Sequence, residues 1–183
     1  MVTDLRLRRL PTAALTSAEV DAIRAILFAA FGDDPEEAFT EDDWDHALGG
    51  THVVADLAGT IVAHASIVPR EIHVGGRPLT TGYVEAVAVR PGEQRRGLGT
   101  AVMRVVAEVV ASSELGALGT GEHGFYERLG WRTWRGPSSV RTEDGERATP
   151  DDDGYLMVLA TPTSPPLDLE APISCELRPG DVW

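Results

Sequence analysis

The stretch Arg90–Thr100, RPGEQRRGLGT, decides the fold because it joins an apolar strand to an apolar helix. The valine-rich run before it, GYVEAVAVR (82–90), predicts a strand. The run after it, LGTAVMRVVAEVVASSE (98–114), places apolar residues at helical spacing. The stretch itself carries three arginines and three glycines in a chain with 29 acidic and 16 basic residues. A basic strand–turn–helix unit therefore stands inside an acidic protein.

A glycine-rich turn in this position is suited to hold an anion. The first N–H groups of a helix lack partners within the helix, and Gly97 and Gly99 let the backbone approach a ligand closely. The arginines supply positive charge, so a pyrophosphate fits the turn. No Lys-Ser/Thr pair follows the glycines and the pattern G-x-G-x-x-G is absent, which excludes the P-loop and the dinucleotide fingerprint. The alternative is a flexible surface turn.

Length and composition predict one globular domain spanning residues 1–183. The net charge of −13 argues against nucleic-acid binding and favours either a cationic ligand or solubility alone. No apolar run is long enough to cross a membrane, and the first residues lack a secretion signal, so we expect a cytoplasmic protein. The single cysteine, Cys175, excludes an intrachain disulfide. The five histidines show no metal-ligand spacing, so we expect no metal and take them as structural or exposed.

The pattern along the chain predicts an α+β fold with a mixed, mostly antiparallel central sheet flanked by helices. A first helix begins at Thr16 or Ser17, where Thr16 and Glu19 fit a capping box, and Thr40 is a good N-cap for a second helix. The remaining elements are antiparallel strands over 51–79, a buried strand over 115–120, a short helix over 121–131, and closing strands over 131–140 and 154–160. The tail over 173–183 is expected to form another strand with a loose end. A polar loop or hairpin tip lies between the first two closing strands.

The motif Gln94-x-x-Gly97-x-Gly99 after a valine strand, followed by FYERLGW (125–131), resembles the GCN5-related N-acetyltransferase (GNAT) superfamily. The resemblance covers residues 51–134 and implies the GNAT fold, with acetyl-CoA bound at the strand–turn–helix unit. Residues 84–89 would pair with the pantetheine arm, the Val87 N–H would stabilise the oxyanion, and Tyr126 would return a proton to the thiolate. The alternative for Tyr126 is packing alone. The implied coenzyme contacts are Val87, Val89, Gln94, Arg95, Arg96, Gly97, Leu98, Gly99, Thr100, Gly119 and Tyr126.

A narrower resemblance runs from Phe39 to Trp183. The segments FTEDDWDHALGGTHVV (39–54), GYVEAVAVR (82–90), TPDDDG (149–154) and RPGDVW (178–183) are similar to the aminoglycoside 2′-N-acetyltransferases. This resemblance implies a cationic aminoglycoside as acceptor, antibiotic resistance, and a homodimer. An acidic protein would concentrate such a polycation. The implied substrate contacts are Asp43, Glu85, the carbonyl of Ala86, Asp152, Asp181 and the carboxylate of Trp183.

The expected reaction is direct attack of the 2′-amine on the thioester, without a covalent enzyme intermediate. A protonated amine must first lose a proton, so Glu85 is the expected general base and the Trp183 carboxylate is a second candidate. Glu85 interrupts an apolar strand, where a charge should be paired or functional. Asp152 lies in an acidic triplet that a solvated loop would also explain.

Three rival functions are considered. The first is a GNAT enzyme that acts on another amine, such as a cell-wall precursor or a polyamine, with aminoglycosides as side substrates, and the sequence does not separate it from the main interpretation. The second is a coenzyme-binding sensor without catalysis, against which the presence of Glu85 and Tyr126 speaks. The third is a protein that only sequesters cationic drugs, in which the coenzyme turn would have no purpose.

Two positions depart from the narrower family. Ala38 stands where an acidic residue usually precedes the Phe39-Thr40 pair, although Asp33, Asp34, Glu36 and Glu37 lie nearby. Gly119 stands where relatives generally carry serine. We therefore expect the substrate preference to differ from that of relatives.

Overall fold

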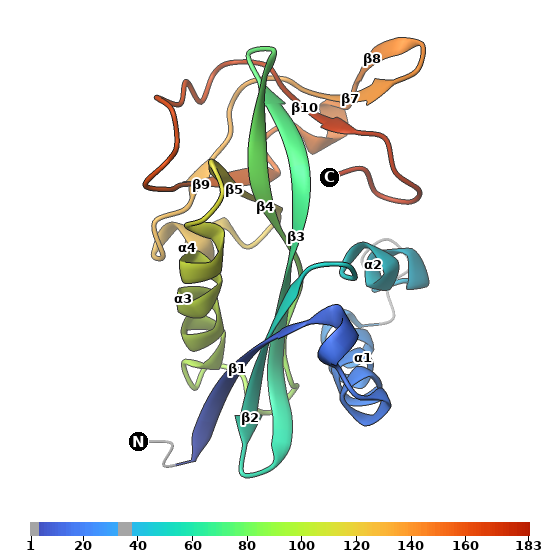
Figure 1. Cartoon of the computed structure of the whole chain (residues 1–183), viewed down its shortest axis with the longest axis vertical. Helices are drawn as coiled ribbons and strands as arrows, with labels where there is room; N and C mark the ends of the chain where they lie inside the picture. Colours follow the sequence, from blue (N-terminus) through green and yellow to red (C-terminus); the bar gives the residue numbers. More distant parts are fainter. Residues whose placement is uncertain (1–3, 33–37) are drawn as a thin grey trace. The chain divides into compact units, whose positions relative to one another are not determined.

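The computed structural model describes residues 4–32 and 38–183, which fall into two compact units (Figure 1). The first unit comprises Met1–Val68 and Val84–Val106, and the second comprises Pro69–Tyr83 and Ala107–Trp183. Strands β3 (Thr60–Val74) and β4 (Arg77–Val89) and helix α3 (Leu98–Val110) run through both units. The assignment of the whole chain to one domain stays a prediction.

The first unit is a strand layer with helices on both sides. It contains β1 (Leu5–Pro11), the 3-10 turn η1 (Thr12–Ala14), α1 (Ser17–Phe31), α2 (Glu41–His46) and β2 (Thr51–Leu57). Strand β2 pairs antiparallel with both β1 and β3. Figure 1 shows α1 and α2 on one side of these strands and the beginning of α3 on the other. Buried apolar residues that include Ile23, Leu27 and Trp44 seal the α1–α2 side.

Both predicted helix starts are confirmed. The Thr16 side chain accepts from the Glu19 N–H while the Glu19 carboxylate accepts from the Thr16 N–H, which is a complete capping box. Thr40 and Asp43 form the same arrangement at α2. Each box satisfies N–H groups that a helix start leaves without partners.

The second unit is built on a mixed sheet. It contains β5 (Leu115–Gly119), α4 (His123–Glu127), β6 (Arg132–Thr133), β7 (Ser138–Thr142), β8 (Gly145–Ala148), η2 (Pro150–Asp152), β9 (Leu156–Ala160) and β10 (Ile173–Glu176). Hydrogen-bonded neighbours follow the order β6-β9-β5-β4-β3-β10-β7-β8. The β4–β5 and β10–β7 pairs are parallel, whereas β5–β9, β6–β9, β7–β8 and β3–β10 are antiparallel. The predicted mixed sheet is therefore present.

Two details of the sequence-based prediction were wrong. The first described element is strand β1, which the prediction lacked. The predicted strand over 131–140 is two strands, β6 and β7, separated by Gly136. A Cβ atom at Gly136 would lie 2.0 Å from the carbonyl oxygen of Ala171, so the backbone there passes too close to another segment to continue as an ordinary strand.

Among the helices of the described ranges, none is long and apolar enough to cross a membrane.

Candidate functional site

The glycine turn of the first unit is anchored at its beginning. The Arg90 N–H donates to the Val62 carbonyl at 2.8 Å, and the Arg90 guanidinium donates to the Ile61 carbonyl at 2.8 Å. Strand β3 therefore holds Arg90 in place, and the Arg90 guanidinium stabilises the fold. Farther along, Gly97 has a φ of +80°, a conformation that favours glycine.

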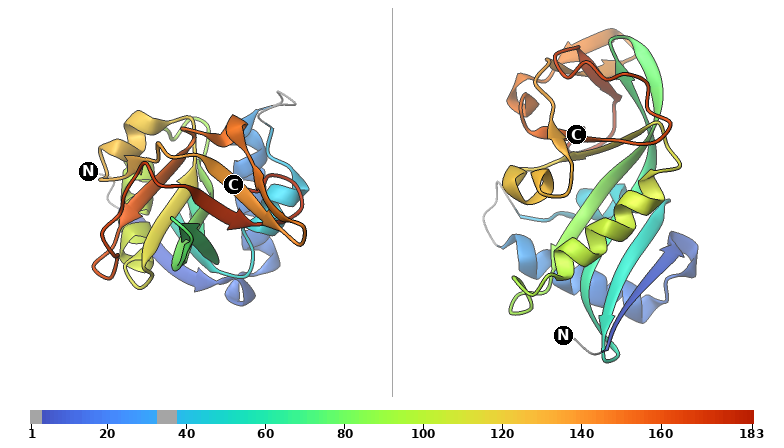
Figure 2. Two further views of the ribbon diagram at one scale, coloured as in Figure 1. Left: turned by 90° about the horizontal axis from the view of Figure 1, so that it is seen from above. Right: turned by 90° about the vertical axis from the view of Figure 1, so that its left-hand side faces the viewer.

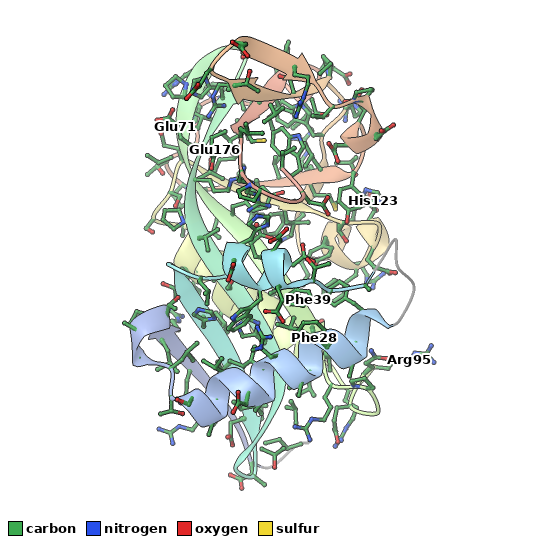
Figure 3. The ribbon with its side chains drawn as sticks, turned by 90° about the vertical axis from the view of Figure 1, so that its right-hand side faces the viewer. Phe28, Phe39, Glu71, Arg95, His123 and Glu176 are labelled. Carbon is green, nitrogen blue, oxygen red and sulfur yellow. The ribbon has the colours of Figure 1, made fainter. Side chains whose placement is uncertain are left out.

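The end of the turn presents N–H groups and positive charge. The first helical bond of α3 runs from the Ala101 N–H to the Gly97 carbonyl, so the N–H groups of Leu98, Gly99 and Thr100 have no partner within the helix. Arg96 forms an ion pair with Glu93. Arg95 is exposed and extends away from the ribbon (Figure 3). These groups suit an anionic ligand and agree with the predicted turn; Gln94 is exposed beside them.

Strand β4 is irregular at the residues predicted to perform chemistry. Ala86 has a φ of +51°, which a residue with a side chain rarely adopts. Glu85, Ala86 and Val87 are all half-buried, whereas Val84 and Ala88 are buried on either side. The Ala86 carbonyl accepts from Nδ1 of the buried His64 at 2.8 Å. A carbonyl oxygen has two lone pairs, so the bond from His64 does not by itself exclude the predicted contact with an amine.

Asp43 has a structural task besides its predicted one. Its Oδ2 accepts from the N–H and the hydroxyl of Thr40, each at 2.7 Å, at the start of α2. The predicted substrate contact of Asp43 would therefore use its other carboxylate oxygen, Oδ1. The acidic residues 33, 34, 36 and 37, considered as substitutes at Ala38, lie outside the described residues.

In the second unit, Tyr126 of α4 is buried. Its ring packs against Phe125 and Trp131, with ring centroids 4.9 Å and 6.2 Å away. Burial raises the pKa of its phenol well above the ordinary value, and the neighbouring Tyr155 and Glu122 add to the rise. Tyr126 therefore stays protonated at neutral pH, which is the form that a hydrogen-bond donor needs.

Gly119, at the end of β5, lies under an aromatic ring. A Cβ atom there would approach the Tyr155 ring to 2.7 Å and the Tyr83 hydroxyl to 3.6 Å. The Tyr155 ring thus stands where a side chain at position 119 would project. Tyr155 itself is 44 % exposed.

The C-terminal segment returns across the second unit and is fixed by side chains (Figure 2). The Trp183 indole donates to the Thr149 hydroxyl at 3.0 Å, next to η2, and only 7 % of Trp183 is exposed. The Val182 carbonyl accepts from the Arg70 guanidinium at 2.9 Å and from the Cys175 thiol at 3.3 Å. These bonds give the last residues a defined place.

Acidic residues gather beside this segment. Asp152 of η2 is half-buried, and burial raises the pKa of its carboxyl, with Asp181, Asp151 and Asp153 adding to the rise. The Thr149 hydrogen bond opposes the rise. The predicted pair Asp152 and Asp181 is thus close enough to interact, and a bound cation would relieve the repulsion between the two carboxylates.

Arg70, which was not among the predicted site residues, holds the C-terminal segment in place. Arg70 is 7 % exposed, donates to Glu176 at 2.8 Å, and stacks over the Tyr83 ring with its guanidinium 4.6 Å from the centroid. Figure 3 labels Glu176, on β10. A lone arginine in a long strand carries no sequence signal for such a role.

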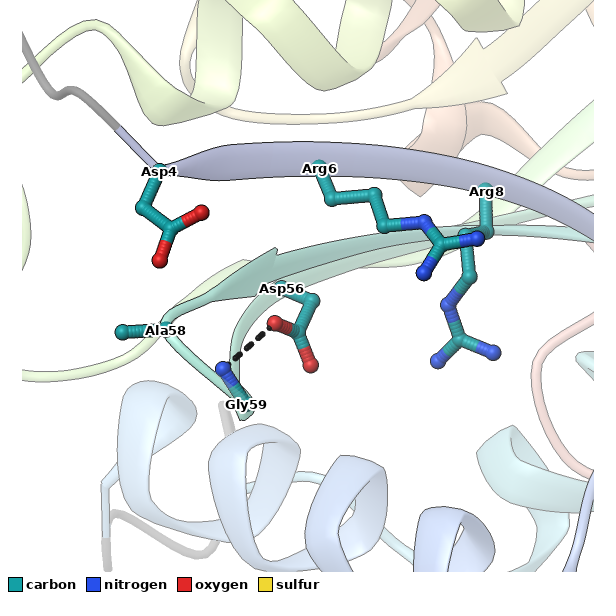
Figure 4. Close-up of a pocket in the computed structure, with 6 residues that line it drawn as sticks. All are labelled: Asp4, Arg6, Arg8, Asp56, Ala58 and Gly59. Carbon is teal, nitrogen blue, oxygen red and sulfur yellow. Dashed lines mark hydrogen bonds between the residues drawn. The ribbon is translucent and has the colours of Figure 1, made fainter.

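The charged recess at the outer strands of the first unit lacks the features of a catalytic site (Figure 4). It is lined by Asp4, Arg6, Arg8, Asp56, Ala58 and Gly59. Arg8 pairs with Glu19 at 2.7 Å, and Asp56 accepts from the Gly59 N–H at 2.8 Å, so these charges stabilise a helix start and a turn. In the part of the chain that the structure describes, no three His, Cys, Asp or Glu side chains are grouped to hold a metal.

Comparison with known proteins places these features in a family. The model of the acetyltransferase (GNAT) domain matches residues 12–134. The chain is 40 % identical over 181 residues to an aminoglycoside 2′-N-acetyltransferase from Mycolicibacterium fortuitum, covering 96 % of this chain and 91 % of that protein. The chain belongs to the aminoglycoside 2′-N-acetyltransferase family of GNAT enzymes.

Solved structures agree with the GNAT fold. A GNAT family acetyltransferase from Brucella melitensis in complex with acetyl-CoA superposes with a TM-score of 0.60 at 20 % identity, covering 89 % of this chain and 92 % of that one. A GCN5-related N-acetyltransferase from Kribbella flavida gives a TM-score of 0.59 at 23 % identity over 75 % of this chain. This GNAT chain spans only 35 % of the Kribbella protein's length. The predicted fold class is confirmed.

Proposed function

We propose that this GNAT enzyme transfers the acetyl group of acetyl-CoA to the 2′-amine of aminoglycosides and so confers resistance to them. The observation that carries the proposal is the match to a curated 2′-N-acetyltransferase over nearly the whole chain. The charge pattern supports it, because a basic turn suits the anionic donor and a strongly acidic chain suits a cationic acceptor. We further infer that the protein acts in the cytoplasm as a homodimer.

The donor is assigned to residues of the first unit and of β5–α4. The N–H groups of Leu98, Gly99 and Thr100, with Arg95 and Gln94, would hold the pyrophosphate. Backbone groups of Val87 and Val89 would pair with the pantetheine arm. The N–H of Val87 would donate to the thioester oxygen as it becomes an oxyanion. Arg96, Gly97 and Gly119 complete the coenzyme contacts that the family resemblance implies.

The acceptor is assigned to acidic residues and to the C-terminal segment. Asp152 and Asp181 would pair with ammonium groups of the drug, because the nearby Asp181 charge helps to raise the pKa of Asp152 and a bound cation would relieve that repulsion. Asp43, the carbonyl of Ala86 and the carboxylate of Trp183 complete the set.

The reaction needs a base, an attack and a donor for the leaving group. Glu85, or alternatively the Trp183 carboxylate, takes a proton from the 2′-ammonium. The amine nitrogen then bonds to the thioester carbon, the carbon–sulfur bond breaks, and the thiolate leaves. The acetylated nitrogen releases its second proton, which ends on the thiolate to give the free thiol of coenzyme A. An ordinary thiol has a pKa of about 8.5, well below that of the Tyr126 phenol, so complete proton transfer to sulfur is uphill. Tyr126 therefore acts mainly by donating a hydrogen bond to the departing sulfur.

The deciding experiment is a thiol-release assay with matched drugs. Gentamicin and tobramycin carry a 2′-amine, whereas kanamycin A and amikacin carry a 2′-hydroxyl. We expect turnover of the first pair only. Turnover of neither pair, combined with thiol release on polyamines or cell-wall precursors, would instead assign the enzyme to a different amine.

The role of the C-terminal segment has its own test. Asp181→Asn should raise KM for the drug while leaving KM for acetyl-CoA unchanged, because Asp181 is exposed and the bond that Arg178 donates to it, at 2.8 Å, goes to its backbone carbonyl, which the substitution keeps. Unaltered drug kinetics would remove this segment from the acceptor site. Asp168→Asn is the matched control, since Asp168 lies on another loop and bonds the Glu170 N–H at 3.0 Å.

A further inference from the structure

Two buried histidines of the first unit form a chain of hydrogen bonds that the proposed reaction does not use. The Thr12 hydroxyl lies 2.8 Å from Nε2 of His52, Nδ1 of His52 lies 2.8 Å from Nε2 of His64, and Nδ1 of His64 lies 2.8 Å from the Ala86 carbonyl oxygen. Both rings have no exposed surface. The chain therefore links the η1 turn through β2 and β3 to the irregular residue of β4.

Every donor in this chain has a fixed direction. A carbonyl oxygen only accepts, so Nδ1 of His64 must carry a proton. Burial lowers the pKa of His64 to about 3 and that of His52 to about 4, so both rings are neutral at pH 7. Nε2 of His64 must then accept from Nδ1–H of His52. Nε2 of His52 accepts in turn from the Thr12 hydroxyl.

The hydrogen bonds at Thr12, the other end of this series, also have a defined direction. The Thr12 oxygen accepts from the Gly49 N–H at 2.9 Å, so its own proton is available for His52. The remaining acceptor near Thr12, the Gly50 carbonyl, is 3.4 Å away and is the weaker partner. All donors thus point one way, from Gly49 to Ala86, and each link polarises the next.

We propose that His64, backed by His52 and Thr12, is a positioning residue that holds the Ala86 peptide and thereby aims Glu85 and Val87. The inference rests on the proposed function, which gives Glu85 and Val87 their tasks. His64 touches neither reacting group and acts through the backbone of β4.

The backbone at Ala86 explains why a clamp is needed there. A φ of +51° in a residue with a side chain persists only when its surroundings impose it. The residues on either side, Glu85 and Val87, both leave the buried pattern that Val84 and Ala88 keep. The bond from His64 holds this peptide from the side of β3. If it is lost, the peptide is free to relax and both flanking groups change direction.

The donor direction is tested directly by nitrogen-15 NMR of the histidine rings in the unmodified protein near pH 7. We expect two of the five histidines to show Nδ1 protonated and Nε2 bare. Spectra of His64→Asn and His52→Gln assign the two signals. A protonated Nε2, or a charged ring, at either residue would overturn the chain. This measurement needs no substrate, so it is independent of the proposed function.

The positioning role is tested by a pair of variants of similar size. In His64→Asn the amide nitrogen takes the place of Nδ1 and still donates to Ala86, whereas His64→Leu has no donor. We expect His64→Leu to lower kcat about 10- to 100-fold with KM for the amine little changed, and His64→Asn to recover most of that loss. Equal kcat values in the two variants would overturn the role, because a ring that only fills space does not distinguish them.

Two controls complete the test. His73→Asn changes another histidine of β3, which pairs with the exposed Glu71 at 2.9 Å, and should leave kcat unchanged. Thr12→Val removes only the hydroxyl at the far end and should lower kcat by a smaller factor than His64→Leu; an effect as large as that of His64→Leu would contradict the proposed order of links. The assay uses whichever amine the unmodified protein turns over fastest. Failure of the aminoglycoside assignment then changes the amine and leaves the comparison of variants intact.

Discussion

The two buried histidines should make the protein unusually sensitive to mild acid. In the unfolded chain each ring takes up a proton as the pH falls through about 6.5. In the folded chain burial keeps His52 neutral down to about pH 4 and His64 down to about pH 3. The unfolded state therefore binds more protons between these limits, and stability falls as the pH falls. Above about pH 7.5 the pair contributes almost no pH dependence.

The size of the effect follows from the two pKa values. Each neutral ring that the unfolded chain would protonate costs about 1.4 kcal/mol per pH unit. Between pH 7 and pH 5 the two rings together remove about 4 kcal/mol of stability, out of the roughly 5–15 kcal/mol that a domain has. This window lies above the range in which carboxylates with lowered pKa values, such as Glu19 and Glu114, lose their contribution.

Urea unfolding followed by tryptophan fluorescence at pH 7, 6, 5.5 and 5 measures this loss. His64→Asn should show about half of the decline, because one neutral ring is gone. A decline below about 1 kcal/mol in the unmodified protein, or the same decline in the variant, would refute the buried neutral pair.

Three further predictions concern single residues. Gly136→Ala should destabilise the protein by about 3 kcal/mol or more, since its Cβ would lie 2.0 Å from the Ala171 carbonyl. Gly121→Ala, where a Cβ meets no atom within 4 Å, should stay within about 0.5 kcal/mol in the same urea measurement. Arg95→Ala should raise KM for acetyl-CoA, and the increase should be smaller at high salt, because salt screens the attraction between Arg95 and the pyrophosphate. An increase that does not depend on salt would show that Arg95 does not contact the pyrophosphate. Glu85→Gln should lower kcat about 100-fold, and an unchanged pH–rate profile would reject its role as base.

Local signals in the sequence were sufficient for the helices and the turn. The Thr16 and Thr40 caps could be predicted because a capping box is made by residues three apart. The glycine turn could be predicted because its arginines and the N–H groups at the start of α3 belong to consecutive residues. Strand β1 was predictable in principle, because Leu5 and Leu7 alternate with arginines, but its pairing with β2 depends on distant residues.

The contacts that could not be predicted from the sequence depend on strand register and on the choice of backbone acceptors. His52 and His64 meet because β2 pairs with β3 so that His52 faces Ser66, a choice that the spacing of two histidines does not reveal. Arg70 fixes the C-terminal segment through the Val182 carbonyl, and a carbonyl is present at every residue. Sequence patterns do not indicate which of many identical acceptors is used.

The ring of Tyr155 over Gly119 bears on how this family diversifies. Because a side chain at position 119 would displace that ring, substitutions at the two positions should have non-additive effects on function. A lineage that acquires serine at 119 must turn the Tyr155 ring aside, which this 44 % exposed side chain can do by moving toward solvent. A position without a side chain thus determines where a neighbouring aromatic ring lies.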